Sequence, residues 1–386
     1  MNNQSTKRIG IDARFYGPTG KGLGRYTQEI VDNVIKIDQV NEYVVFLSKD
    51  NFDEFECDNQ RIKKILANVR WYTLREQFVM PRLISTAKVD LMHYLHFNVP
   101  IFSCKKFVVT IHDLILIKYP TPRASTLSPI LYKIKNFFYR IIIWLAINRA
   151  KKIIAVSKFT KQDIIKYFKI KPEKIAMIYE GVANLSNGRD SLFTAKQNDK
   201  AVISEYNITD PFLLYIGNAY PHKNLERLVQ VFQKIQENNL EKFQNLKLVL
   251  VGKEDYFYKR LKEETKNNAV IFAGYVPDNQ LEAMFSQALC YVFPSLYEGF
   301  GLPPLEAMAK GCPVVSSNRS CLPEVLEDAA IYFDPENMTE MQTEIEKLLN
   351  NEDLRQKLIQ EGYQQIKKYD WWESARQTLQ VYQELL

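Results

Sequence analysis

The chain has 386 residues, of which 46% are hydrophobic, and a formal net charge of +6. This length predicts two domains or more, and the apolar content is sufficient for full-sized cores. The mild positive charge fits anionic substrates or an anionic membrane surface and is too weak to indicate a nucleic-acid partner. The five cysteines are an odd number without a CxxC pair, which predicts reduced thiols in a cytosolic compartment and disfavours a zinc ribbon.

The beginning of the chain, MNNQSTKRIGID, is polar and leads directly into a predicted strand, so it lacks the apolar core of a signal peptide. The longest apolar run, IIIWLAI at 141–147, is too short to span a bilayer, which needs about 20 residues. We therefore expect a cytoplasmic protein.

Short apolar runs recur along both halves of the chain and predict strands. In the first half they lie at 8–12, 43–48, 90–95, 107–112, 152–156 and 175–180. In the second half they lie at 212–217, 247–252, 269–274, 289–294, 313–316 and 330–333. Helix-patterned stretches such as LERLVQVFQKIQ and NQLEAMFSQA lie between several of them. This alternation predicts an α/β protein with two doubly wound, Rossmann-like domains, each built on a parallel sheet.

A polar stretch without periodicity, NLSNGRDSLFTAKQNDK at 184–200, predicts a linker or surface loop. We place the first domain at 1–190 and the second at 200–365, with a helix at about 370–386 that could pack back on the first. Two such domains would face a cleft, and ligands of open α/β sheets bind beyond the carboxyl ends of the strands. Motifs that directly follow a strand are therefore the candidate site.

The segment EGFGLPPLEAMAKGCPVV, 298–315, meets this condition, because it follows a predicted strand and continues into a helix. Pro303 and Pro304 suit the first turn of a helix, whose amides and dipole form an anion site. Gly299 and Gly301 would let backbone approach a ligand closely. Two interpretations stay open from the residues alone. Glu298 and Glu306 either hold the hydroxyls of a nucleotide sugar, or are a solvated loop residue and a complement to the helix dipole.

The longer string YEGFGLPPLEAMAKGCPVVSSNRSCLPEV, 297–325, resembles the E-x7-E region of retaining glycosyltransferases of family 4, which have the GT-B fold. The resemblance covers nearly the whole chain and is strongest from 213 to 335. It implies that Glu298 holds hydroxyls of the transferred sugar and that Glu306 holds the ribose hydroxyls of the nucleotide. It also implies that the amides of Phe300, Gly301 and Leu302 line the diphosphate.

Lys223 follows another predicted strand, within YIGNAYPHKNLERLV at 215–229. A lysine there either neutralises a diphosphate leaving group or lies on the surface at a helix start. The resemblance favours the first role, because PHKN matches the family pattern. Asn218 stands where the family often has arginine, so neutralisation would rest on Lys223, the helix N-terminus and Arg25.

The glycine-rich segment GPTGKGLGRYTQEI, 17–30, has neither Walker A spacing nor the dinucleotide fingerprint. It is either a flexible turn before a helix or, by its resemblance to the GxGRY loop of the family, a donor-binding loop in which Gly22 and Gly24 approach the ligand. The resemblance also implies that the backbone of Val276 contacts the base.

Histidines supply the remaining candidates. His112 ends the strand of TIHDL, where a lone histidine is often structural, but the resemblance implies a hydrogen-bonding or polarising residue beside the reacting sugar. His93 and His96 lie three residues apart without an evident third ligand, so we expect no metal. We expect His96 and Asn98 to line the acceptor pocket. Glu180 stands where many relatives carry asparagine.

The stretch SPILYKIKNFFYRIIIWLAINRAKK, 128–152, combines an apolar helix with basic residues. It is either an ordinary helix packed on a sheet or a basic amphipathic helix that lies on an anionic membrane at the inner face of the plasma membrane.

The predicted function is therefore that of a retaining glycosyltransferase. It would move a hexose from a nucleoside diphosphate sugar, GDP-mannose first and a UDP-hexose second, to a glycan or polyprenol-linked acceptor. We expect the donor to act as a co-substrate, with no cofactor. Two alternatives are a nucleotide-sugar epimerase of the same fold, which would need no acceptor, and a non-catalytic sugar-binding protein.

Overall fold

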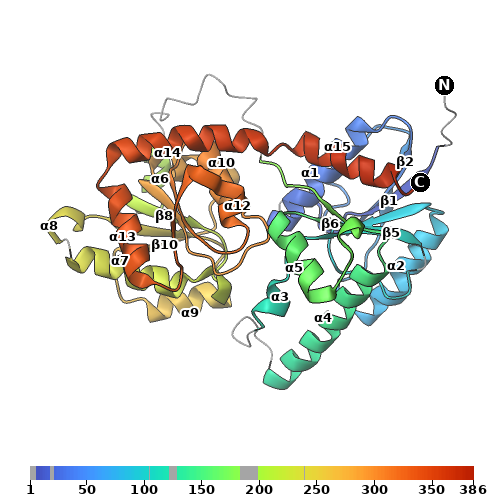
Figure 1. The fold of residues 1–386 in the computed structure, drawn as a ribbon, viewed down its shortest axis with the longest axis horizontal. Coiled ribbons are helices and arrows are strands. Elements are labelled where there is room, and N and C mark those ends of the chain that lie inside the picture. The colour runs from blue at the N-terminus through green and yellow to red at the C-terminus, as the bar shows by residue number, and fades with distance from the viewer. Residues whose placement is uncertain (1–5, 18–20, 104, 121–127, 183–198, 239) are drawn as a thin grey trace. The chain divides into compact units, whose positions relative to one another are not determined.

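The computed structural model describes residues 6–17, 21–103, 105–120, 128–182, 199–238 and 240–386. Contacts divide the chain into two units, each with its own sheet (Figure 1). Unit 1 comprises Met1–Lys118, Ser128–Gly181 and Asp370–Leu386, and unit 2 comprises Tyr119–Leu127 and Val182–Tyr369. The predicted linker at 184–200 lies, up to residue 198, outside the described residues.

The sheet of unit 1 is parallel throughout, in the order β3-β2-β1-β4-β5-β6-β7. Its described strands are β1 Arg8–Asp12, β2 Glu42–Leu47, β3 Ile62–Leu66, β4 Leu91–Tyr94, β5 Lys106–Ile111, β6 Lys152–Ala155 and β7 Ile175–Met177. The central strands are buried on both faces, which is why they appear in the sequence as unbroken apolar runs.

Helices cover both faces of this sheet. They are α1 Lys21–Ile37, α2 Leu74–Thr86, α3 Ile115–Lys118, α4 Pro129–Arg149, α5 Lys158–Phe168 and α15 Trp371–Gln383. Several begin at a side chain that accepts a hydrogen bond from an amide of the first turn, as Thr73 does for α2 and Ser157 for α5. The last helix, α15, packs on α1 and so belongs to unit 1.

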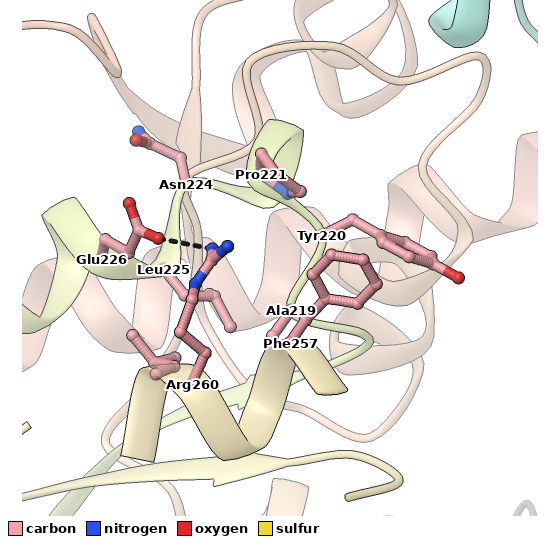
Figure 2. Close-up of a pocket in the computed structure, with 9 residues that line it drawn as sticks. Ala219, Tyr220, Pro221, Asn224, Leu225, Glu226, Phe257 and Arg260 are labelled. Carbon is pink, nitrogen blue, oxygen red and sulfur yellow. Dashed lines mark hydrogen bonds and ion pairs between the residues drawn. The ribbon is translucent and has the colours of Figure 1, made fainter. Parts of the chain in front are cut away.

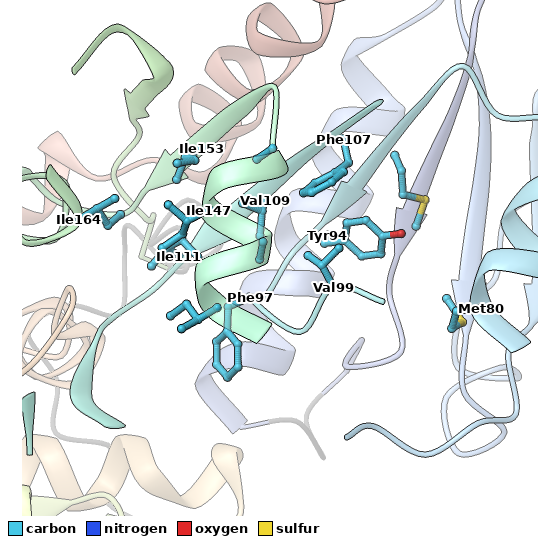
Figure 3. Packing of buried hydrophobic residues seen from close by; sticks show 14 of the residues in the cluster. Met80, Tyr94, Phe97, Val99, Phe107, Val109, Ile111, Ile147, Ile153 and Ile164 are labelled. Atoms are coloured by element: carbon cyan, nitrogen blue, oxygen red, sulfur yellow. The ribbon is translucent and has the colours of Figure 1, made fainter. Parts of the chain in front are cut away.

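The core of unit 1 joins the sheet to α2 and α4 (Figure 3). Phe107, Val109 and Ile111 of β5 project toward the second half of α4, which contributes Ile143 and Ile147, both fully buried. Burying a large aliphatic side chain stabilises the folded state by about 1.5–3 kcal/mol. This packing fixes one side of α4 against the sheet.

The sheet of unit 2 is also parallel throughout, in the order β10-β9-β8-β11-β12-β13. Its described strands are β8 Phe212–Ile216, β9 Lys247–Val251, β10 Val270–Gly274, β11 Cys290–Phe293, β12 Val314–Ser317 and β13 Ala330–Phe333. This is the strand order of a Rossmann fold. The predicted α/β class, with two doubly wound domains, is confirmed.

The helices of unit 2 alternate with these strands. They are α6 Asp199–Ser204, α7 Leu225–Asn238, α8 Leu240–Phe243, α9 Tyr256–Glu264, α10 Asp278–Gln287, α11 Leu302–Ala309, α12 Leu322–Leu326, α13 Met338–Leu349 and α14 Glu352–Gln365. Asp255, Asn337 and Asn351 cap α9, α13 and α14 through their side-chain oxygens.

In each sheet the strand order reverses at one place: between β1 and β4 in unit 1, and between β8 and β11 in unit 2. Loops that follow such a pair diverge to opposite sides of the sheet and leave space for a ligand beyond the carboxyl ends. The segments after these four strands therefore form the candidate sites of the two units.

Candidate functional site

Lys223 and Glu298 meet in unit 2, in the segments that follow β8 and β11. The Lys223 Nζ lies 2.6 Å from the Glu298 Oε1, and both side chains are largely buried. The same ammonium lies 5.5 Å from the centre of the Phe293 ring. Lys223 and Glu298 are 75 positions apart in the chain and were predicted from separate motifs. The structure makes them partners at the point where the strand order reverses.

The turn that carries Lys223 is held by hydrogen bonds to the neighbouring segment. Lys223 ends the 3-10 turn Pro221–Lys223, and Asn224 follows in a left-handed conformation. Its side-chain Nδ2 donates to the carbonyls of Pro294 and Pro335. The amide of Leu296 donates to the His222 carbonyl. Burial, together with the charge of Lys223, lowers the pKa of His222 to about 4, so this imidazole is neutral near pH 7.

The helix α11 begins at Leu302, with Gly301 as its N-cap at φ +91°. A β-carbon at Gly301 would also come within 2.8 Å of the Leu322 Cδ2, so both conformation and space favour glycine here. Pro303 and Pro304 carry no amide hydrogen, which leaves Leu302 and Leu305 as the amide donors among the first four helical residues.

Glu298 and Glu306 lie on the two sides of this turn. The Glu298 amide donates to the Ser320 Oγ, 2.9 Å away, which fixes the loop before α11. Burial raises the pKa of Tyr291 well above its ordinary value, and the charges of Glu306 and then Glu298 raise it further. Both carboxylates therefore lie within electrostatic reach of one phenol.

The other donor-binding candidates of unit 2 occupy different settings. The Asn218 Oδ1 accepts from the Tyr220 amide, which closes the turn after β8. The side chain of Phe300 is buried, with its ring edge-on to Tyr369, so only its backbone could face a ligand. Leu302 is half-buried at the start of α11, directly after Gly299, Phe300 and Gly301 in the chain. Val276 follows the edge strand β10 with its side chain buried.

A small pocket lies behind the Lys223 turn, bordered by Tyr220, Pro221 and Asn224 on one side and by Phe257 and Arg260 of α9 on the other (Figure 2). Arg260 reaches across it to Glu226, with 2.8 Å between Nη2 and Oε1. The pocket has a volume of about 30 Å³, whereas ligand pockets generally measure about 300–1,000 Å³. It can therefore hold water molecules but is too small for a nucleotide.

In unit 1, His112 directly follows β5 and lies between two oxygen atoms. Its Nδ1 is 3.0 Å from the Glu180 Oε1, and its Nε2 is 2.9 Å from the Leu95 carbonyl oxygen. Both oxygens only accept, so the doubly protonated imidazolium satisfies both. Burial disfavours this charge, but the hydrogen bond and the charge of Glu180 raise the pKa of His112 above its ordinary value. His112 is therefore arranged as a donor, not as a base.

A chain of buried polar groups connects His112 with the C-terminal helix. The Tyr382 hydroxyl of α15 lies 2.6 Å from the His93 Nδ1, and the His93 Nε2 lies 2.9 Å from the Thr110 Oγ1. Thr110 also contacts the hydroxyl of Tyr26, whose ring meets the His112 ring edge-on. Burial lowers the pKa of His93 to about 3, so both of its nitrogens serve this neutral network.

Several buried polar side-chain atoms have no hydrogen-bond partner in the described part of the chain. Three of them belong to the segments that follow β3 and β4: the Trp71 Nε1, the His96 Nδ1 and the Asn98 Oδ1. The rings of Trp71 and His96 both pack against Phe15. The Asn98 amide nitrogen donates to the Glu76 Oε1, 2.7 Å away, so its oxygen is turned elsewhere. Unpartnered buried polar atoms are rare and commonly mark the place of water or a ligand.

The two glycines of the predicted donor loop differ in their surroundings, although both lie in the first turn of α1. A β-carbon on Gly24 would come within 2.1 Å of the Gly17 carbonyl oxygen, so this glycine is required by the packing of the chain itself. A β-carbon on Gly22 would have no neighbour within 4 Å, so space remains there.

Two supporting residues, Trp71 and Glu76, were not predicted from the sequence. Trp71 gave no signal, because no motif contains it. Glu76, which accepts from Arg14 and Asn98, occupies the fourth position of the capping box Thr73–Glu76 and could have been found from that pattern. Within the described residues, no group of three or more His, Cys, Asp or Glu could hold a metal ion.

Comparison with known families gives two matches that together cover most of the chain. Residues 196–365 match the family model for glycosyl transferases group 1, and residues 20–183 match the model for Glycosyltransferase Family 4. The first match lies within unit 2, and the second lies mostly within unit 1.

Among characterised relatives, an O-antigen chain mannosyltransferase B of Escherichia coli is 27% identical over 94% of this chain and 95% of its own. The O-antigen chain mannosyltransferase RfbU of Salmonella typhimurium is 24% identical over 86% and 88%. Among solved structures, the sucrose-phosphate synthase of Thermosynechococcus elongatus aligns with a TM-score of 0.75 at 18% identity over 98% of this chain and 99% of its own. WaaG, a glycosyltransferase involved in lipopolysaccharide biosynthesis, aligns with a TM-score of 0.70 at 15% identity over 97% and 99%.

Proposed function

Because the chain belongs to glycosyltransferase family 4 and is a glycosyltransferase, we propose that it transfers mannose from GDP-mannose to a hydroxyl of a glycan or polyprenol-linked acceptor, with retention. The sugar and the acceptor class are supported by the mannosyltransferases of O-antigen chains that resemble it over most of their length. In this reaction the bond from the anomeric carbon to the diphosphate breaks, and a bond to the acceptor oxygen forms on the same face of the sugar. The acceptor's proton leaves with the diphosphate.

The pairing of Lys223 with Glu298 where the strand order reverses is the observation that carries the proposal. Negative charge develops on the departing diphosphate, and a positioned ammonium stabilises it more than it stabilises the substrate. Lys223 would exchange Glu298 for a phosphate oxygen when the donor binds. The N-terminus of α11, with the amides of Phe300, Gly301 and Leu302, would supply the rest of the positive potential.

The two glutamates would then hold hydroxyl groups. Glu298, released from Lys223, would accept from hydroxyls of the mannose, and Glu306 from the ribose hydroxyls. We assign the close approach of the diphosphate to Gly299, with Asn218 at the edge of this site and the Val276 backbone on the base. In unit 1 we assign Gly22, with the open space beside it, to the donor, whereas Gly24 shapes the turn.

His112 would donate to a hydroxyl of the transferred sugar, exchanging the Leu95 carbonyl for it. For the acceptor we propose His96 and Asn98, together with Trp71. Their unpartnered atoms offer a donor in the Trp71 Nε1 and an acceptor in the Asn98 Oδ1, and neighbouring aromatic rings offer a flat apolar face. Sugars present this combination of hydroxyls and apolar C–H faces.

The experiment that tests the donor is a thermal-shift panel of GDP-mannose, UDP-glucose and UDP-galactose, because a ligand that binds only the folded state raises the melting temperature. We expect the largest shift with GDP-mannose. NMR of the donor, with and without acceptor, then separates transfer from isomerisation. Conversion of the donor into another nucleotide sugar without an acceptor would support an epimerase instead.

The site itself is tested by Lys223→Ala, for which we expect kcat/KM to fall by about a hundredfold or more, as when one donor to a developing anion is removed. Lys262→Ala, on an exposed position of α9, is the matched control and should leave kcat/KM unchanged. Glu306→Ala should mainly weaken donor binding. Wild-type kinetics in both Lys223→Ala and Glu306→Ala would reject the assigned site.

A further inference from the structure

Helix α4 presents two apolar sides, of which only one is covered. Its second half packs on the sheet of unit 1 through Ile143, Ala146 and Ile147, all nearly inaccessible to solvent. Figure 1 shows the beginning of α4 extending away from the strands. There, large side chains are exposed: Ile130 72%, Leu131 54%, Ile134 49%, Phe137 61% and Phe138 56%, followed by Trp144 53%.

These exposed residues form a continuous surface, not a scatter. Positions 130, 134, 137, 141 and 144 recur every three or four residues and so share one side of a helix with 3.6 residues per turn; of these, Ile141 is half-buried and the others are exposed. We call this set the outer stripe of α4; Leu131 and Phe138 border it. The core-facing positions 139, 143, 146 and 147 fall on the opposite side. An exposed apolar stripe of this length marks an interaction surface.

Basic residues border the outer stripe. Lys133 and Arg140 lie along one edge, and Lys135 lies beyond Leu131 and Phe138 on the other. Lys133 and Lys135 are exposed, and Arg140 donates to the hydroxyl of the exposed Tyr167 on α5. No acidic residue occurs anywhere between Pro129 and Arg149. The surface is thus apolar along its centre and positive along its margins.

We propose that the outer stripe of α4 binds the surface of an anionic phospholipid bilayer. Apolar and aromatic side chains would enter the boundary between headgroups and acyl chains, and the lysines would contact the lipid phosphates. Trp144 suits this boundary, because indole combines a large apolar body with one polar N–H. Along the described residues no helix is long and apolar enough to cross a bilayer. Since its other side is packed on the sheet, α4 would lie along the surface.

A second copy of the chain fits this surface less well. Pairing two outer stripes about a two-fold axis would place the basic margins of one stripe against those of the other, with no acidic residue of α4 to offset them, which like charges disfavour. The anionic headgroups of a bilayer complement these charges instead. The net charge of +6 of the chain likewise favours binding to an anionic bilayer.

The experiment is flotation of the purified full chain with vesicles of phosphatidylcholine alone and of phosphatidylcholine mixed with phosphatidylglycerol. We expect the chain to float only with the mixed vesicles and to be released as the salt concentration rises. Phe137→Glu should abolish flotation, and each of Lys133→Ala and Lys135→Ala should weaken binding about fivefold. Leu74→Glu, on an exposed position of α2 outside the stripe, is the control and should float like the wild type.

Flotation needs neither donor nor acceptor, so its result does not depend on the proposed function. Turnover with a water-soluble acceptor should be equal in Phe137→Glu and the wild type, which separates membrane binding from catalysis. Unchanged far-UV circular dichroism and melting temperature would confirm that Phe137→Glu folds. Absence of flotation of the wild type at low salt, or equal flotation of Phe137→Glu, would overturn the proposal. A wild-type dimer in light scattering that Phe137→Glu converts to a monomer, without any vesicle effect, would assign the stripe to a second copy and likewise overturn it.

Discussion

His112 illustrates how a single residue is tuned by one neighbour. Its ring nitrogens lie between a carboxylate and a carbonyl, both of which only accept hydrogen bonds. A neutral imidazole has one N–H and would leave one of these oxygens unmatched. The carboxylate of Glu180 thus keeps this imidazole charged over a wider pH range.

Replacing this carboxylate should move the titration of the histidine. In Glu180→Gln we expect the pKa of His112 to fall, because the charge and hydrogen bond that raise it are lost. NMR of the imidazole signals as a function of pH measures this directly, since the chain has only four histidines. Glu173→Gln, on an exposed position, should leave the titration unchanged. An unshifted His112 in Glu180→Gln would contradict the assigned pair.

The same pair predicts how stability depends on pH. Because the pKa of His112 is raised in the folded state above 6.5, protonated His112 contributes stability that is complete below about pH 6.5. This contribution is lost as the pH rises through the folded-state pKa. The stability difference between the wild type and Glu180→Gln, from urea unfolding, should therefore be largest at the acidic end and shrink with rising pH. A difference that grew with pH would exclude a charged His112.

At the residue scale, sequence could indicate the positions that directly follow strands. Lys223 and Glu298 were found in this way, because the carboxyl ends of neighbouring parallel strands meet at one edge of a sheet. The sequence could not show that they are partners, since that depends on β8 lying beside β11. Nor could it show the contact of Glu180 with His112, which is made across 68 positions of the chain.

At the scale of elements, the two glycines in the first turn of α1, Gly22 and Gly24, differ in how tightly the surrounding chain packs against them. Gly24→Ala should destabilise the protein, because its β-carbon would collide with the carbonyl oxygens of Gly17 and Phe15. Gly22→Ala should leave the melting temperature unchanged or raise it, since alanine favours a helix by about 1 kcal/mol over glycine. If Gly22 faces the donor, this substitution should nevertheless raise the KM for the donor.

Calorimetry together with donor kinetics on both variants checks this pair. A stable Gly24→Ala protein would mean that the turn can shift, and an unchanged KM in Gly22→Ala would remove this glycine from the donor site.

Strand β3 shows where element prediction failed. Its sequence, IKKIL, has two adjacent lysines and was not recognised. The strand lies at the edge of the sheet, where Lys63 and Lys64 are exposed and the Lys64 Nζ donates to carbonyls of the preceding loop. Edge strands often carry lysine, which discourages pairing with other chains. The apolar runs that mark central strands are therefore absent from an edge strand of this kind.

At the scale of the molecule, unit 1 depends on a helix that follows unit 2 in the chain. Trp371 of α15 is almost fully buried in unit 1, whereas its neighbour Trp372 is 49% exposed. Trp371→Ala should destabilise unit 1 by about 3–5 kcal/mol, and Trp372→Ala should have little effect. Hydrogen exchange should be faster in α1 and β1 of Trp371→Ala and unchanged in α13 of unit 2. Equal acceleration in both units would show that they unfold together.

The two sheets and their class were predictable at this scale, because each half of the chain alternates apolar runs with helical patterns. The sequence also led us to expect that a helix at about 370–386 could pack on the first domain, but an amphipathic helix does not specify which residues it covers. The sequence could not indicate, for example, that the Tyr382 hydroxyl contacts His93, because His93 lies 289 positions earlier in the chain.

The return of α15 to unit 1 has a consequence for synthesis. When the ribosome has released the chain up to Tyr369, every segment of unit 2 is present, whereas unit 1 still lacks Asp370–Leu386. Unit 1 thus begins to be translated before unit 2 but is completed after it. Until α15 has been made, α1 exposes the apolar surface that α15 later covers. Nascent chains stalled shortly before Asp370 should accordingly bind chaperones through their earliest segments.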